Sequence, residues 1–185
     1  MKELSLHILD IAQNSVTAGA TRIKILVDEQ PADNTLRIII EDNGSGMDKA
    51  FLARVADPFL TTRTTREVGL GIPLFKQAAE MTGGKFSITS KVGFGTSVTA
   101  DFVYDSLDRM PLGDMPSTIA ALLGSKPGID WNYEHRYGKN AFCFGTREVI
   151  RQIGDIDFSL PEIAEWTIQY ISEQLQNLYG RAFEK

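Results

Sequence analysis

The sequence predicts an α+β fold with a small α/β appendage at its C-terminal end. The first twenty residues carry apolar side chains often enough for a largely buried helix, and segments 22–28 and 36–40 carry the patterns of strands. The composition changes after residue 104, where proline, glycine and aspartate become frequent. We therefore expect a main domain over residues 1–104 and an appendage over residues 105–185.

The bulk composition is that of an ordinary globular protein. Of the 185 residues, 43% are hydrophobic and 23% are charged, and the formal net charge is -5. This acidic balance argues against a nucleic-acid partner, because phosphate recognition requires a basic surface. No apolar run is long enough to span a membrane and no signal peptide opens the sequence, so we expect a cytoplasmic protein without a membrane partner. The single cysteine, Cys143, lies between two phenylalanines and is expected in a strand core.

Apolar periodicity and the placement of glycine define the elements of the main domain. Paired glycines at positions 44 and 46, and again at 83 and 84, mark loops and helix ends. The predicted order is a helix over 1–20, strands over 22–28 and 36–40, a helix over 48–55, a loop over 57–68, a helix over 70–81, and strands over 85–90 and 96–104.

The appendage is predicted to begin with a linker, residues 105–117. A short helix over 118–123, a hairpin over 129–137 and 141–147, and a last helix opening at a capping box, Ser159–Glu162, are expected after it. The last helix carries one apolar stripe. This stripe either covers one face of the hairpin, leaving Trp131 or Phe142 outward, or forms a partner-binding or dimer surface.

Asp10 and Asn14 form the first motif with chemical potential. They lie four residues apart on the first predicted helix and therefore share one face. The amide oxygen of Asn14 is a hard ligand suited to Mg²⁺, and the Asp10 carboxylate can receive a proton from a water molecule. A polar pair at this spacing is more often a solvated helix face, but apolar neighbours argue against that interpretation here.

The second motif, Asp42–Gly46, follows a predicted buried strand. A carboxylate at a strand end can accept a hydrogen bond from the exocyclic amine of adenine, and Gly44 and Gly46 let the ring lie against the backbone. Because Asp-Asn-Gly is also ordinary turn chemistry, the motif alone leaves both interpretations open.

The third motif, Gly69-Leu70-Gly71, opens a helix. Backbone N–H groups at a helix start can bind phosphate oxygens, and glycine permits their close approach. The preceding loop supplies hydroxyl and guanidinium groups, including those of Thr61-Thr62-Arg63, and is predicted to close as a lid over a triphosphate. The alternative is a solvated loop before a helix with glycine caps.

In this order, the motifs resemble those of the GHKL superfamily of gyrase, heat-shock chaperone, histidine kinase and MutL ATP-binding domains. Asp10–Ser15 resembles the N box of MutL proteins, and Asp42–Met47 resembles the first glycine box. Asp57–Arg63 is similar to the F box of sensor histidine kinases, and Val68–Ile72 is similar to their second glycine box. The resemblance covers about residues 1–104 and is carried by the ordered set.

The resemblance implies a two-layer α/β sandwich, the Bergerat ATP-binding fold, with ATP and Mg²⁺ as cofactors. It implies that Asn14 binds Mg²⁺, that Asp42 binds adenine, and that Asp10 occupies the general-base position, which is usually glutamate in the hydrolysing members. The further nucleotide-binding residues that it implies are Gly44, Gly46, Met47, Thr61, Thr62, Arg63, Gly69, Leu70, Gly71 and Thr96. Thr96 is implied to support Asp42 through a water molecule.

The sequence departs from these relatives at both ends. Only six residues precede His7, so we expect no phosphoacceptor-histidine domain before the first motif, and we place His7 on the helix surface or in the core. The segment after residue 104 is too short and too acidic to match the second, DNA-acting domain of MutL and gyrase.

We therefore expect a stand-alone, histidine-kinase-like ATP-binding protein of signal transduction that uses Mg-ATP to phosphorylate or remodel a separate protein partner. The reaction stays open between a kinase acting in trans on a histidine or, like the anti-sigma kinases, a serine, and an ATPase that drives a conformational cycle. A nucleotide sensor without catalysis is the remaining alternative. A homodimer also stays open.

Overall fold

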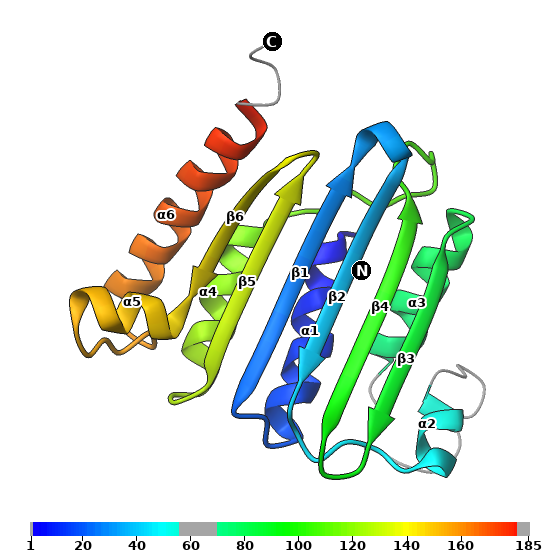
Figure 1. Cartoon of the computed structure of the whole chain (residues 1–185), viewed down its shortest axis with the longest axis horizontal. Coiled ribbons are helices and arrows are strands. Elements are labelled where there is room, and N and C mark those ends of the chain that lie inside the picture. The colour runs from blue at the N-terminus through cyan, green and yellow to red at the C-terminus, as the bar shows by residue number, and fades with distance from the viewer. Residues whose placement is uncertain (1, 56–69, 181–185) are drawn as a thin grey trace.

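A six-stranded mixed sheet organises the protein, whose computed structural model describes residues 2–55 and 70–180 (Figure 1). Across the sheet the order is β3-β4-β2-β1-β5-β6. The strands are β1 (Arg22–Gln30), β2 (Thr35–Asp42), β3 (Lys85–Lys91), β4 (Gly95–Val103), β5 (Asp130–Tyr137) and β6 (Asn140–Gly145). Neighbouring strands are antiparallel except for β1 and β5, which are parallel.

The described residues also form six α-helices and one short 3₁₀ helix. They are α1 (Leu4–Thr17), η1 (Pro31–Asp33), α2 (Lys49–Val55), α3 (Gly71–Met81), α4 (Met115–Ser125), α5 (Thr146–Ile153) and α6 (Pro161–Gly180). None of these helices is long and apolar enough to cross a membrane. The predicted loop over 57–68 lies outside the described residues.

The main helices pack on one face of the sheet, which confirms the predicted two-layer α/β sandwich. Ile23, Ile25 and Val27 of β1 face this layer and are almost fully buried, whereas Lys24 and Asp28 on the other face are only partly covered. Figure 1 shows α1, α3 and α4 behind the sheet. The period-two pattern of β1 therefore reflects a strand with one face in the core and one toward solvent.

The C-terminal segment continues the sheet of the main domain. Strand β5 pairs with β1 along its whole length, from Asp130 beside Arg22 to Tyr137 beside Glu29. Helix α4 packs beside α1, and α6 covers β5 and β6. Buried side chains of both segments form one hydrophobic cluster, so the boundary predicted near residue 104 separates two parts of one sheet and one core.

Helix α6 covers the β5–β6 hairpin with its apolar stripe. This was one of the two alternatives predicted for the stripe. Ile171 is fully buried, and the ring of Tyr170 lies 6.1 Å from the rings of both Phe142 and Phe144. The expectation that Trp131 or Phe142 faces outward is wrong. Their side chains are 4% and 9% exposed, because they lie on the side of the hairpin that the helices cover.

Three further details of the C-terminal segment differ from the prediction. Cys143 is exposed, because it alternates with two phenylalanines that occupy the buried side of β6. Helix α5 replaces the end of the predicted second hairpin strand, and Glu148 pairs with Arg151 one turn later to support it. The capping box does not form: α6 begins at Pro161, and Ser159 donates its hydroxyl and backbone hydrogen bonds to Asp157.

A buried hydrogen-bond network joins β1 to the C-terminal segment. The Glu29 carboxylate accepts hydrogen bonds from the hydroxyls of Tyr179 (2.5 Å) and Tyr104 (3.2 Å) and from Nε2 of His135 (2.8 Å). Nδ1 of His135 in turn accepts from the Tyr133 hydroxyl at 2.6 Å. Burial alone would raise the pKa of Glu29, but the hydrogen bonds from His135, Tyr179 and Tyr104 outweigh it and lower this pKa. Glu29 is therefore a buried carboxylate whose hydrogen-bond donors come from β5, from α6 and from the segment that follows β4.

Removing one donor of this network should destabilise the protein. We expect Tyr179→Phe to lower the free energy of unfolding by about 1–3 kcal/mol, because a hydrogen bond to a buried charged acceptor is lost. Tyr170→Phe is the matched control, since Tyr170 lies on the same helix but its hydroxyl makes no hydrogen bond within the described ranges. Urea unfolding gives the free energy of unfolding of both variants. An equal loss of stability in the two would show that the Tyr179 hydroxyl does not stabilise the protein through Glu29.

The stabilisation by this network should depend on pH in a defined direction. Because the folded-state pKa of Glu29 is lowered, its contribution is present above the pKa of an unfolded glutamate, about 4.3, and is lost as the pH falls through the folded-state value. The stability difference between the parent and Tyr179→Phe should therefore shrink in acid. If the stability difference between the two proteins stays constant from neutral pH to well below the pKa of an unfolded glutamate, Glu29 does not carry the effect.

Candidate functional site

A cavity of about 240 Å³ lies between α1, the end of β2 and the start of β4. Asn14, Asp42, Gly46, Met47 and Thr96 all line it. These five positions, predicted as site residues from three separate segments, are therefore brought together. The apolar lining includes Ile11, Ile40, Phe51, Val55, Ile72 and Val98.

The carboxylate of Asp42 is held at both oxygens. Its Oδ2 accepts a hydrogen bond from the Ser15 hydroxyl at 2.6 Å, and its Oδ1 accepts from the backbone N–H of Gly44 at 2.8 Å. Each carboxylate oxygen retains a further lone pair, so Asp42 can still accept a hydrogen bond from a ligand. Ser15 was not among the predicted site residues. It lies four residues after Ile11, on the buried face of α1, and a buried hydroxyl needs a hydrogen-bond partner, which was the signal that could have identified it.

Asn43 anchors the loop that follows Asp42. Its side-chain oxygen accepts hydrogen bonds from the backbone N–H groups of Thr21 (2.9 Å) and Arg22 (2.8 Å), at the start of β1. The backbone N–H of Ser45 donates to the carbonyl of Ala18 at 2.9 Å. The loop is therefore fixed to the connection between α1 and β1.

Gly46 cannot be replaced without moving this loop. Its φ is +66°, and a Cβ at this position would lie 2.1 Å from the carbonyl oxygen of Lys91. The loop thus packs directly against the β3–β4 turn, and glycine at position 46 is required for this backbone contact.

Ser90 connects the loop to Thr96. Its hydroxyl accepts from the backbone N–H of Met47 at 2.8 Å and lies 2.9 Å from the Thr96 hydroxyl. Thr96 stands directly opposite Asp42 in the β2–β4 ladder. The implied water between Thr96 and Asp42 stays a prediction, and Ser90 is a second residue that the sequence analysis missed.

Asp10 lies against the start of α3. A Cβ on Gly71 would lie 2.4 Å from Asp10 Oδ2, so a larger residue at position 71 would force the Asp10 side chain to move. Helix α3 has no side-chain cap, and its positive N-terminal end favours a nearby carboxylate or another anion. The polar face of α1 with Asp10 and Asn14 therefore meets the predicted phosphate-binding end of α3, where Leu70 is exposed.

His7 lies in the core and does not line the cavity. Its side chain is 2% exposed and stacks on Phe75 with ring centres 5.6 Å apart. Burial lowers the pKa of His7, so its ring is neutral at physiological pH. Neither ring nitrogen has a hydrogen-bond partner among the residues that the structure describes.

Four predicted site residues, Thr61, Thr62, Arg63 and Gly69, lie outside the described residues, as does the predicted lid. Within the described ranges, no three histidine, cysteine, aspartate or glutamate side chains form a metal-binding group. A magnesium site does not require such a cluster, because Mg²⁺ usually keeps several waters and takes one or two carboxylate or amide ligands.

Several bacterial sensor kinases are similar in sequence to this chain. The tetrathionate sensor histidine kinase TtrS of Salmonella typhimurium is 32% identical over 59% of this chain and 18% of its own length. The histidine-protein kinase AtoS of Escherichia coli is 34% identical over 50% of this chain and 15% of its own length. The chain thus spans less than a fifth of these relatives.

A solved N-terminal domain of a DNA repair protein has the same fold, with a TM-score of 0.57 at 15% identity over 79% of this chain and 53% of that one. A family model described as histidine kinase-, DNA gyrase B-, and HSP90-like ATPase matches residues 2–105. Because this match covers more than half of the chain and contains the residues that form the cavity, the protein belongs to the histidine kinase-, DNA gyrase B- and HSP90-like ATPase family.

Proposed function

We propose that the protein binds Mg-ATP in the cavity beside Asp42 and uses it to phosphorylate a separate protein partner. The observation that carries the nucleotide assignment is the Asp42 carboxylate, which is oriented at both oxygens and lines an otherwise largely apolar cavity. An adenine ring fits this combination, since its exocyclic amine donates to a carboxylate while Met47 and Val98 offer apolar contact to the ring.

The neighbouring residues fit a metal-bound triphosphate. Asn14 is exposed at the cavity and offers an amide oxygen to Mg²⁺, and the start of α3 at Gly71 offers backbone N–H groups to phosphate oxygens. When bound, Mg²⁺ would supply charge neutralisation at the phosphates. The cavity is smaller than the roughly 300–1,000 Å³ of typical sites for drug-sized ligands. This volume suits the adenine base alone, with the phosphates extending toward Asn14.

Asp10 supports phosphoryl transfer or hydrolysis over sensing. In either reaction a nucleophile bonds to the γ-phosphorus, the bond to the bridging oxygen breaks, and ADP leaves. A serine hydroxyl or a water must also lose a proton, which the Asp10 carboxylate can accept, whereas a histidine imidazole is already nucleophilic. The sensor histidine kinases among the relatives favour histidine, so the phosphoacceptor is to be found by experiment.

The adenine assignment is tested at Asp42. Asp42→Asn should weaken Mg-ATP binding roughly 10- to 100-fold, because a charge-assisted hydrogen bond to the adenine amine is lost. Glu41→Gln is the matched control, since Glu41 is the preceding residue on β2 but is exposed on the other face of the sheet. Calorimetric titration measures both affinities, and an unchanged affinity in Asp42→Asn would refute the assignment.

The role of Ser15 is tested separately. Ser15→Ala leaves the Asp42 carboxylate in place but removes one of its two orienting donors, so we expect Mg-ATP affinity to fall about 2- to 10-fold. Ser45→Ala should have no comparable effect, because Ser45 lines the same cavity without contacting Asp42. If the two variants bind Mg-ATP equally well, Ser15 does not position Asp42 for the ligand.

The general-base role of Asp10 is tested with ATP that is labelled at its γ-phosphate. The experiment measures transfer of the label to partner proteins captured from cells that produce this protein. Asp10→Asn should keep nucleotide affinity and lose transfer or hydrolysis by roughly 100-fold or more. Turnover equal to that of the parent would exclude Asp10 as the base. A parent protein that binds Mg-ATP but neither hydrolyses it nor labels a partner would instead support the nucleotide-sensing alternative.

A further inference from the structure

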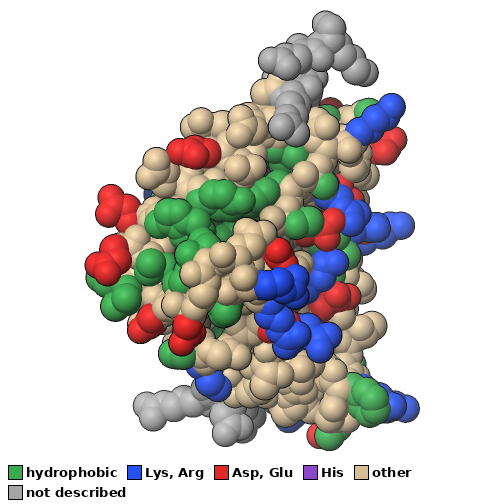
Figure 2. All heavy atoms as spheres, turned by 60° about the vertical axis from the view of Figure 1, so that its left-hand side comes forward, with side chains coloured by type: hydrophobic (Ala, Val, Ile, Leu, Met, Phe, Trp, Pro, Cys, Tyr) green, Lys and Arg blue, Asp and Glu red, His purple; other side chains and the backbone are tan. Residues whose placement is uncertain are grey.

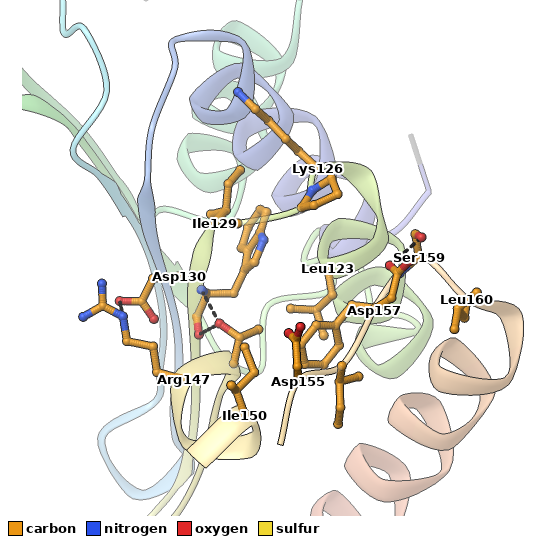
Figure 3. Close-up of a pocket in the computed structure, with 16 residues that line it drawn as sticks. Leu123, Lys126, Ile129, Asp130, Arg147, Ile150, Asp155, Asp157, Ser159 and Leu160 are labelled. Carbon is orange, nitrogen blue, oxygen red and sulfur yellow. Dashed lines mark hydrogen bonds and ion pairs between the residues drawn. The ribbon is translucent and has the colours of Figure 1, made fainter. Parts of the chain in front are cut away.

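The C-terminal segment contains a second, larger cavity of about 670 Å³ (Figure 3). It lies between the end of α4, the start of β5, helix α5 and the connection from α5 to α6, and all its lining residues fall within 123–160. No lining residue is shared with the cavity beside Asp42. Its volume falls within the roughly 300–1,000 Å³ of small-molecule sites. The part of the chain beyond the family match therefore has room for a ligand of its own.

Apolar side chains form much of the wall. Leu123, Ile129 and Trp131 are almost fully buried, while Ile150 and Leu160 are 40% and 42% exposed. Figure 2 shows the side of the molecule that bears α5 and α6, where apolar side chains are exposed together with acidic side chains along one border. A ligand with an apolar body would remove part of this surface from water.

The indole ring of Trp131 forms part of the wall of this cavity. Its side chain is 4% exposed and lines the cavity, and its Nε1 has no hydrogen-bond partner among the described residues. The backbone of the same residue is satisfied, because its N–H donates to the Thr146 hydroxyl at 3.0 Å. The Nε1 atom itself is closed off from solvent, so the residue offers a ligand the apolar surface of its ring and no hydrogen-bond donor.

The charges around the cavity select a cation. Asp130 pairs with Arg147 at 3.1 Å, and Asp157 accepts both hydrogen bonds of Ser159. In Figure 3, Lys126 extends away from the cavity, whereas the Asp155 carboxylate lies between Leu123 and Ile150. Asp155 has no ion-pair or hydrogen-bond partner within the described ranges. It is therefore the acidic group at the cavity that is available to a ligand.

We propose that this cavity binds a small apolar amine, the chemistry of an aromatic amino-acid amide. The ammonium group pairs with Asp155, and the apolar body contacts Leu123, Ile129 and the indole ring of Trp131. The site is separate from the nucleotide site and does not depend on the proposed reaction.

The test uses the full chain and follows the two indole N–H signals, from Trp131 and Trp166, in ¹⁵N–¹H spectra. Replacing each tryptophan with phenylalanine in turn assigns them. Titration with phenylalaninamide should move the Trp131 signal saturably and leave the Trp166 signal in place, because Trp166 does not line the cavity. The absence of a saturable shift of the Trp131 signal would overturn the proposal.

Two comparison probes and two variants test the charge. Uncharged N-acetylphenylalaninamide should bind about two- to fivefold more weakly than phenylalaninamide, and anionic N-acetylphenylalanine more weakly still, because exposed ion pairs contribute modestly. Asp155→Asn should abolish the preference for the amine. Asp33→Asn, in the β1–β2 connection, should retain it. Equal affinities of the three probes for the parent protein, or an unchanged preference in Asp155→Asn, would overturn the amine assignment.

Discussion

The pairing of β1 with β2 on one side and with β5 on the other is the constraint on which the rest of the structure depends. Pairing with β2 places Ile23 beside Asp42, and the backbone at the start of β1 is hydrogen-bonded to Asn43, so β1 fixes the loop that follows Asp42. Pairing with β5 places Glu29, near the other end of β1, beside the buried His135 network. One central strand therefore positions both the candidate site and the attachment of the C-terminal segment.

This arrangement also places the two cavities near the same end of β1. The backbone N–H of Asp130, which lines the larger cavity, donates to the Thr21 carbonyl at 2.9 Å, and the N–H of Thr21 donates to Asn43. Asn43 directly follows Asp42 in the loop of the candidate site. The segment beyond the family match is thus in direct backbone contact with the connection that anchors this loop.

The sequence was informative where function depends on local motifs. Asp42, Gly46 and Met47 occupy one short loop, and Asn14 and Thr96 belong to motifs with a characteristic order, so their convergence could be predicted. Cys143 was assigned to the core although strand alternation, with Phe142 and Phe144 on one face, places it on the other.

Features formed by distant residues could not be predicted in this way. Strand β5 pairs in parallel with β1, and Glu29 binds His135 106 residues later. No local periodicity encodes either contact. Ser15 and Ser90 were missed for a related reason, because a serine gains significance only when the fold supplies its partner, here Asp42 for one and Met47 and Thr96 for the other.

The parallel contact between β1 and β5 has a consequence for how the chain acquires its fold. During synthesis, β1 and β2 can form a hairpin early, but one edge of β1 stays without its partner until residues 130–137 have been made. The final contact, from Glu29 to Tyr179, closes a loop of 150 residues. Such non-local contacts raise the contact order and slow folding. The nascent protein therefore exposes the unpaired N–H and C=O groups of a strand edge for much of its synthesis, the period in which protection by a chaperone matters most.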